Sequence, residues 1–169
     1  YTKGVYRDFL EDELQKYLGV DHAITCASGT AALWIAMRVM RQMCRTKRIL
    51  MPAFNWQSDR IAAESAGYWI AYTDIDPDTW LPVLLLDRGY DSCLALDTFG
   101  SVDTNEYPEN TICDSTHSLG AKGAGSRGVA ECFSLAATKP VTGGEGGVIT
   151  TNDRDFAERC AGLRDLCAR

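Results

Sequence analysis

A lysine, an aspartate and two glycine-containing segments are the residues of this chain best suited to chemistry. Ala27-Ser28-Gly29-Thr30 joins a predicted strand to a predicted helix, and the unpaired N–H groups at a helix N-terminus favour a bound phosphate. Asp114 and Lys139 each follow a short apolar strand, and the run Gly143-Gly144-Glu145-Gly146-Gly147 comes soon after the lysine. Glycines there would let the backbone pack tightly around a group attached to Lys139.

Together these features match the needs of pyridoxal 5′-phosphate (PLP). This cofactor takes a lysine as a Schiff base, an aspartate at its pyridine nitrogen, and hydrogen-bond donors for its phosphate. Each residue also has a simpler interpretation, because Ser28 and Asp114 could be helix N-caps and Lys139 a solvated surface lysine. The combination at strand ends, rather than any single residue, favours a PLP site.

Other chemistries lack the residues they need. The segment Gly123–Gly128 reads Gly-x-Gly-x-x-Gly, but a predicted strand follows it where a dinucleotide-binding loop requires a helix, so we interpret it as a turn. The chain has two histidines, His22 and His117, no Cys-x-x-Cys pair and no Gly-Lys-Ser or Gly-Lys-Thr. A serine hydrolase, a metal site and a Walker loop are therefore not expected.

The composition is that of a soluble globular protein. The 169 residues include 17 basic and 23 acidic side chains, for a formal net charge of −6, and 46% are hydrophobic. We expect no nucleic-acid partner, because phosphate binding needs clustered basic residues, and no membrane segment, because no apolar run approaches ~20 residues. Seven scattered cysteines fit reduced thiols in the cytoplasm. The chain begins at Tyr1 without a methionine, and we expect it to be a piece of a longer chain.

Strand and helix patterns alternate along the chain. Apolar residues at helical spacing predict helices at residues 5–18, 29–44, 57–66 and 153–166. Short apolar runs predict strands at residues 22–26, 48–51, 68–73, 93–97, 111–113, 129–135 and 147–151. This succession predicts an α/β fold, a three-layer αβα arrangement with a largely parallel sheet of about seven strands. Ligands of such sheets bind at the carboxyl ends of the strands, where the residues singled out above lie.

The ordered motifs of the chain resemble those of the DegT/DnrJ-type sugar aminotransferases, which are PLP enzymes of fold type I. The similarity runs over essentially all 169 residues and is carried by Ala27–Leu33, Asp74–Thr79, Asp114–Ala121, Phe133-Ser134, Thr138-Lys139 and Glu145–Gly147. The resemblance implies one cofactor-binding domain over residues 1–169, without the C-terminal small domain that family members carry. It also implies a homodimer, because the family builds its active site between two subunits.

The resemblance gives individual residues their roles. Lys139 falls at the Schiff-base lysine that also carries the substrate proton, and Asp114 at the carboxylate that keeps the pyridine nitrogen protonated. Trp56 falls at the aromatic residue that stacks over the ring, and His117 lies near the phenolic oxygen. From the residues alone, His117 could equally be a helix-surface residue, and an aromatic before a helix, such as Trp56, is more often simply core. The implied phosphate-binding residues are Ser28, Gly29, Thr30 and Ser134.

A few residues depart from the family pattern. Cys113 stands where the family commonly has glutamate, and Asn55 and Asp59 replace threonines. These neighbours shape the pocket and leave Lys139 and Asp114 in place.

The function that the resemblance implies is transfer of an amino group, from glutamate, to a keto sugar attached to a nucleotide. Family members specialised for dehydration replace the lysine with histidine, so Lys139 argues for amino transfer. The alternative is a truncated, non-catalytic domain that keeps the fold as a binding or oligomerisation module.

Overall fold

The chain folds around one mixed sheet, as seen in a computed structural model that describes residues 4–45, 47–83, 92–97, 100–102, 107 and 109–165. The elements are α1 (Val5–Leu18), β1 (His22–Cys26), α2 (Gly29–Met43), β2 (Arg48–Pro52), α3 (Gln57–Ala66), β3 (Trp69–Thr73), β4 (Ser92–Leu96), β5 (Thr111–Asp114), β6 (Ala130–Ser134), β7 (Gly147–Thr151) and α4 (Arg154–Arg164). Each predicted element is present, and the described ends lie within two residues of their predicted positions. Residue 166, the predicted end of the last helix, lies outside the described residues.

The sheet has seven strands in the order β1-β7-β6-β5-β4-β2-β3. The central pairs and the β2–β3 edge pair are parallel, and β7 runs antiparallel to both of its neighbours, β1 and β6. The largely parallel sheet is therefore confirmed. Because parallel strands end at the same edge, the segments that follow β2, β4, β5 and β6 all emerge there.

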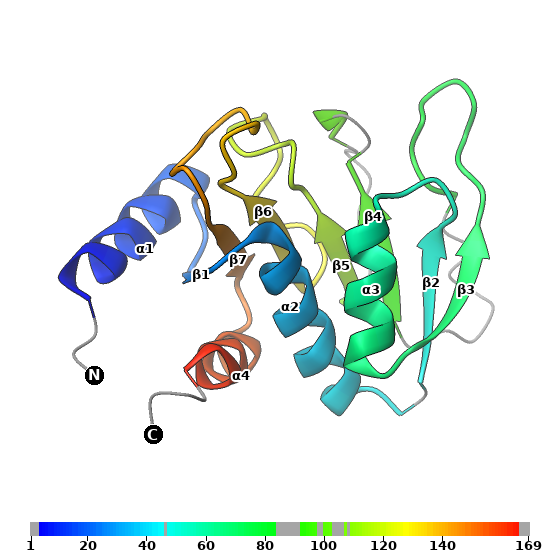
Figure 1. The fold of residues 1–169 in the computed structure, drawn as a ribbon, viewed down its shortest axis with the longest axis horizontal. Coiled ribbons are helices and arrows are strands. Elements are labelled where there is room, and N and C mark those ends of the chain that lie inside the picture. The colour runs from blue at the N-terminus through cyan, green and yellow to red at the C-terminus, as the bar shows by residue number, and fades with distance from the viewer. Residues whose placement is uncertain are drawn as a thin grey trace.

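Helices cover both faces of the sheet, which gives the three predicted layers (Figure 1). On one face, α2 packs between α3 and α4. On the other face, Leu14 of α1 lies in a cluster with Phe133 of β6 and Val148 of β7. Their chain neighbours Cys132 and Ile149 belong to the cluster beneath α2, α3 and α4, as the alternation of side chains along a strand requires. Among the described residues, no helix is long and apolar enough to cross a lipid bilayer.

Local sequence signals set the helix ends. The Ser28 hydroxyl accepts a hydrogen bond from the Ala31 N–H (3.1 Å) and caps α2, as predicted, and Asp153 caps α4 in the same way. Gly19 and Gly67 end α1 and α3 in the left-handed conformation, at φ 67° and 92°. The cap at Ser28 places the first turn of α2 directly after β1, at the edge where the parallel strands end.

Candidate active site

A cavity of about 770 Å³ opens at this edge of the sheet. It is bounded by the N-terminus of α2, the segment after β2, and the turns that follow β5 and β6. Seven of the eight residues predicted for the site line it: Ser28, Gly29, Thr30, Trp56, His117, Ser134 and Lys139. Residues separated by more than 100 positions in the sequence are thus brought to one wall.

The N-terminus of α2 is pressed against the end of β6. A Cβ built on Gly29 would lie 2.8 Å from the Cβ of Ser134, and one built on Gly147 would collide with the backbone oxygen of Ser28. Glycine at both positions is what allows this close approach. The Ser134 side chain therefore lies beside the first turn of α2, whose N–H groups have no acceptor within the helix. Such a cradle fits a phosphate group, because these donors and the helix dipole both favour an anion.

Gly29→Ala is expected to disturb this cradle. The added methyl group would push Ser134 and α2 apart, so we expect a loss of about 1–3 kcal/mol in the free energy of unfolding and weaker binding of inorganic phosphate. Urea unfolding and phosphate titration measure the two effects. The matched control is Gly162→Ala in α4, where a Cβ meets nothing within 4 Å and should stabilise the chain by up to about 1 kcal/mol. Equal stability of the two variants would contradict the close packing at Gly29.

Lys139 and His117 contact each other at the cavity wall. Lys139 Nζ lies 2.7 Å from His117 Nε2. Burial lowers the pKa of His117, the charge of Lys139 lowers it further, and Asp114 partly opposes both. The imidazole is thus kept neutral, so its Nε2 can accept a hydrogen bond from the lysine ammonium. The sequence predicts both residues but gives no sign of this contact.

The simpler interpretations of Lys139, His117 and Trp56 are wrong. Lys139 is half-buried and bonded to a histidine, so it is not a freely solvated lysine. His117 lies in the turns that follow β5 and not on a helix surface. Trp56, the residue before α3, is 76% exposed at the cavity and is therefore not core.

Asp114 is the predicted site residue that does not line the cavity. It ends β5, is 2% exposed, and lies next to the lining residue Thr116, whose N–H donates to its Oδ1 (3.0 Å). The residues after it form turns, so it is no helix N-cap. Burial raises the pKa of Asp114, and the hydrogen bonds from Thr116 and Asp59 partly lower it. Asp59 of α3 is completely buried beside it.

A buried ionic network behind the cavity was not predicted from the sequence. The Arg127 guanidinium donates two hydrogen bonds to Asp97 (2.7 and 2.6 Å), two to Glu131 (3.1 and 2.8 Å) and one to the Ser115 hydroxyl (2.7 Å). Although burial opposes it, these acidic partners raise the pKa of Arg127. Because Asp97 lines the cavity, the network fixes part of its wall. The available signal was Glu131, a charged residue inside an otherwise apolar strand.

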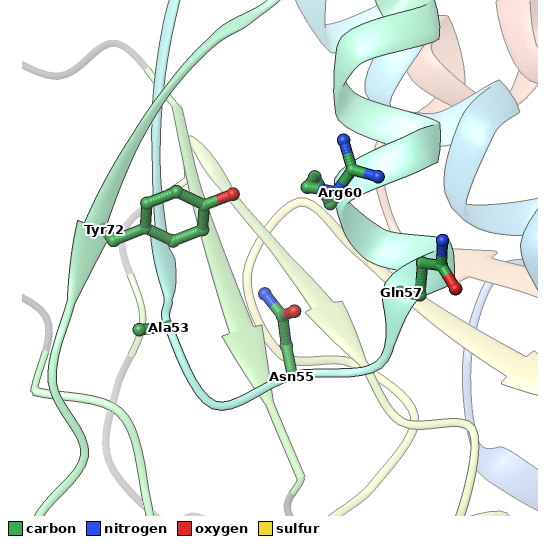
Figure 2. Close-up of a pocket in the computed structure, with 5 residues that line it drawn as sticks. All are labelled: Ala53, Asn55, Gln57, Arg60 and Tyr72. Atoms are coloured by element: carbon green, nitrogen blue, oxygen red, sulfur yellow. The ribbon is translucent and has the colours of Figure 1, made fainter.

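A second cavity of about 490 Å³ lies beside the segment after β2 (Figure 2). In Figure 2 the side chains of Tyr72, Asn55 and Arg60 surround this space. Asn55 also lines the main cavity and donates to the Pro52 carbonyl (2.6 Å). Asn55 therefore contributes to both cavities. The full lining is Ala53, Asn55, Gln57, Arg60 and Tyr72.

Known proteins are similar to this chain over most of its length. The chain is 27% identical to L-glutamine:2-deoxy-scyllo-inosose aminotransferase of Streptomyces paromomycinus over 88% of this chain and 39% of that protein. It is 29% identical to UDP-2-acetamido-2-deoxy-3-oxo-D-glucuronate aminotransferase of Pseudomonas aeruginosa over 93% of this chain and 48% of that protein. Thus the chain spans less than half the length of either relative.

The chain also shares its fold with a solved structure. NtdA from Bacillus subtilis, determined with bound cofactor PMP, superposes with a TM-score of 0.85 at 21% identity, covering 97% of this chain and 41% of that one. The profile of the DegT/DnrJ/EryC1/StrS aminotransferase family matches residues 1–85 and 106–169. Since this match takes in all the motifs singled out in the sequence, the chain belongs to the DegT/DnrJ/EryC1/StrS aminotransferase family, whose members bind PLP or PMP.

Proposed function

We propose that this chain is the cofactor-binding portion of a PLP-dependent aminotransferase that transfers an amino group from glutamate to a keto sugar attached to a nucleotide. The observation that carries the proposal is the Lys139–His117 contact in the wall of a cavity that also contains the α2 N-terminus. A lysine and a phosphate cradle in one cavity are the two attachments that PLP requires.

The residues present fit the cofactor. The cradle of Gly29, Thr30 and Ser134 offers N–H and hydroxyl donors to a phosphate, and a side chain at position 29 would fill it. PLP held by Lys139 and the phosphate cradle would supply an electron sink for the substrate carbon, once the amino group of the substrate has replaced Lys139 on the cofactor.

The residues of the chain hold and move protons around that group. Neutral His117 accepts from the Lys139 ammonium and holds Nζ at the cavity wall, which positions the lysine as the acid and base that carries the substrate proton. Asp114, held by the Thr116 N–H, supplies the negative charge that would keep a pyridine nitrogen protonated. Trp56, at the rim, would cover the flat face of the ring.

Substrate class and assembly rest on the family. The Pseudomonas relative is named as an aminotransferase of a UDP-linked oxo sugar, which supports a nucleotide-linked keto sugar as the acceptor here. We also propose a homodimer, because the site of such enzymes is completed by a second subunit. We propose the cytoplasm as its location, because its scattered cysteines fit reduced thiols.

A single-turnover assay tests the function. The chain is loaded with PLP, freed of excess cofactor, and given glutamate; we expect about one 2-oxoglutarate per bound cofactor, because the first half-reaction leaves the amino group on the cofactor. The control is the same chain reduced with borohydride before glutamate is added, which fixes the cofactor to the lysine. Loaded chain that releases no 2-oxoglutarate, from glutamate alone or with a nucleotide-linked keto sugar, would contradict amino transfer and favour a non-catalytic binding module.

A further inference from the structure

Asp59 is an acidic residue on the buried face of α3, where apolar side chains are expected. It is completely buried, although it is the second carboxyl group in a region that already contains Asp114. Its Oδ1 accepts from the Ser58 hydroxyl (3.2 Å), and its Oδ2, also buried, accepts from no donor among the described residues. An oxygen of an ionised carboxylate in that position would lose its hydration without compensation.

Asp114 is the group beside it. The two carboxyls are close enough that each acts on the pKa of the other, and Asp114 itself accepts from the Thr116 N–H. Among the described residues, neither carboxyl has a salt bridge to a lysine or arginine. The buried guanidinium of Arg127 pairs with Asp97 and Glu131 instead. Two carboxylates in contact repel each other, whereas a carboxyl and a carboxylate attract, so one shared proton satisfies both groups.

We infer that Asp59 is a positioning residue that carries this proton, donates it in a hydrogen bond to Asp114, and keeps Asp114 oriented and singly charged. The inference about the proton rests on the buried pair alone. What Asp114 then does toward a pyridine nitrogen rests on the proposed function.

The electrostatics agree with the geometry. Burial and the charge of Asp114 raise the pKa of Asp59 to about 9. The other titratable groups that act on Asp114 or feel its charge are Asp97, held by Arg127, the thiols of Cys113 and Cys132, and His117. Asp59 is thus protonated in the folded chain at neutral pH and ionised in the unfolded chain.

This difference predicts how stability depends on pH. Between about pH 4 and pH 9 the folded chain binds one more proton at Asp59 than the unfolded chain does, so raising the pH favours unfolding. The contribution of Asp59 to the unfolding constant should approach a tenfold increase per pH unit, or about a thousandfold from pH 5 to pH 8.

Asp59→Asn tests the inference in the chain without cofactor, because asparagine keeps the size and a donor but cannot ionise. Urea unfolding from pH 5 to pH 8 should show the ratio of wild-type to variant unfolding constants rising steeply with pH. Asp12→Asn, on the exposed face of α1, is the matched control and should keep the wild-type pH dependence. A constant ratio between wild type and Asp59→Asn would overturn the inference.

A measurement on the wild-type chain covers the case in which Asp59→Asn does not fold. Side-chain ¹³C NMR of the aspartates at pH 7 should show one protonated carboxyl that becomes ionised when urea unfolds the chain. All aspartates ionised in the folded chain would overturn the inference. Neither experiment uses PLP, so a failure of the proposed function, which appears only with the cofactor, is distinguishable from a failure here.

Discussion

Lys139→Ala should abolish covalent attachment of PLP in the main cavity of this chain. In the structure Lys139 Nζ lies at the wall of the main cavity, 2.7 Å from His117 Nε2, and the phosphate cradle of α2 opens into the same cavity. No other lysine lines that cavity among the described residues. After incubation with PLP, borohydride reduction and removal of free cofactor, the variant should retain cofactor only at the background of surface lysines.

Lys122→Ala is the matched control for this experiment. Lys122 is exposed in the turns after β5 and does not line the cavity, so its loss should leave cofactor retention at the wild-type level. Circular dichroism of both variants checks that the fold is intact. Cofactor retention by Lys139→Ala equal to that of Lys122→Ala would contradict the role of Lys139.

Arg127→Ala should cause a large loss of stability. The guanidinium binds Asp97 and Glu131, which are 3% and 0% exposed, so its removal leaves two buried acidic groups without their cation. Breaking a buried ion pair in this way costs about 3–5 kcal/mol, a large share of the 5–15 kcal/mol typical of a folded domain. Urea or thermal unfolding at pH 7 measures the loss.

Arg154→Ala separates burial from charge. Arg154 pairs with Glu158 on α4, where the two side chains are 83% and 64% exposed, so the same substitution should cost less than about 0.5 kcal/mol. Similar losses for the two variants would contradict the view that the Arg127 network stabilises the cavity wall through its burial.

The elements of the fold could be predicted because their signals are local. Ser28 is an N-cap by residue type, Gly19 and Gly67 end helices in a conformation that glycine adopts freely, and the apolar runs have the length of buried strands. The edge at which ligands bind follows from the parallel strands, so the neighbourhood of Ser28 and Lys139 could be predicted as well.

The contacts between site residues could not be predicted, because they join positions far apart in the sequence. Arg127 meets Asp97 across 30 residues, and Lys139 meets His117 across 22. Asp59 was noted only as a departure from the family pattern, and its burial against Asp114 depends on how α3 packs on the sheet. Which charged residues lie inside is decided by tertiary packing, which short-range patterns do not record.

The most direct test of the account is to locate the cofactor on the wild-type chain. The purified chain is mixed with PLP, reduced with borohydride, digested and mapped by mass spectrometry. If this cavity is the PLP site, one major modified peptide should contain Lys139, and inorganic phosphate should compete with PLP because it would occupy the same cradle. A folded chain that carries no label at Lys139, or that carries it in equal amounts on exposed lysines such as Lys122, would contradict the assignment of this cavity as the PLP site.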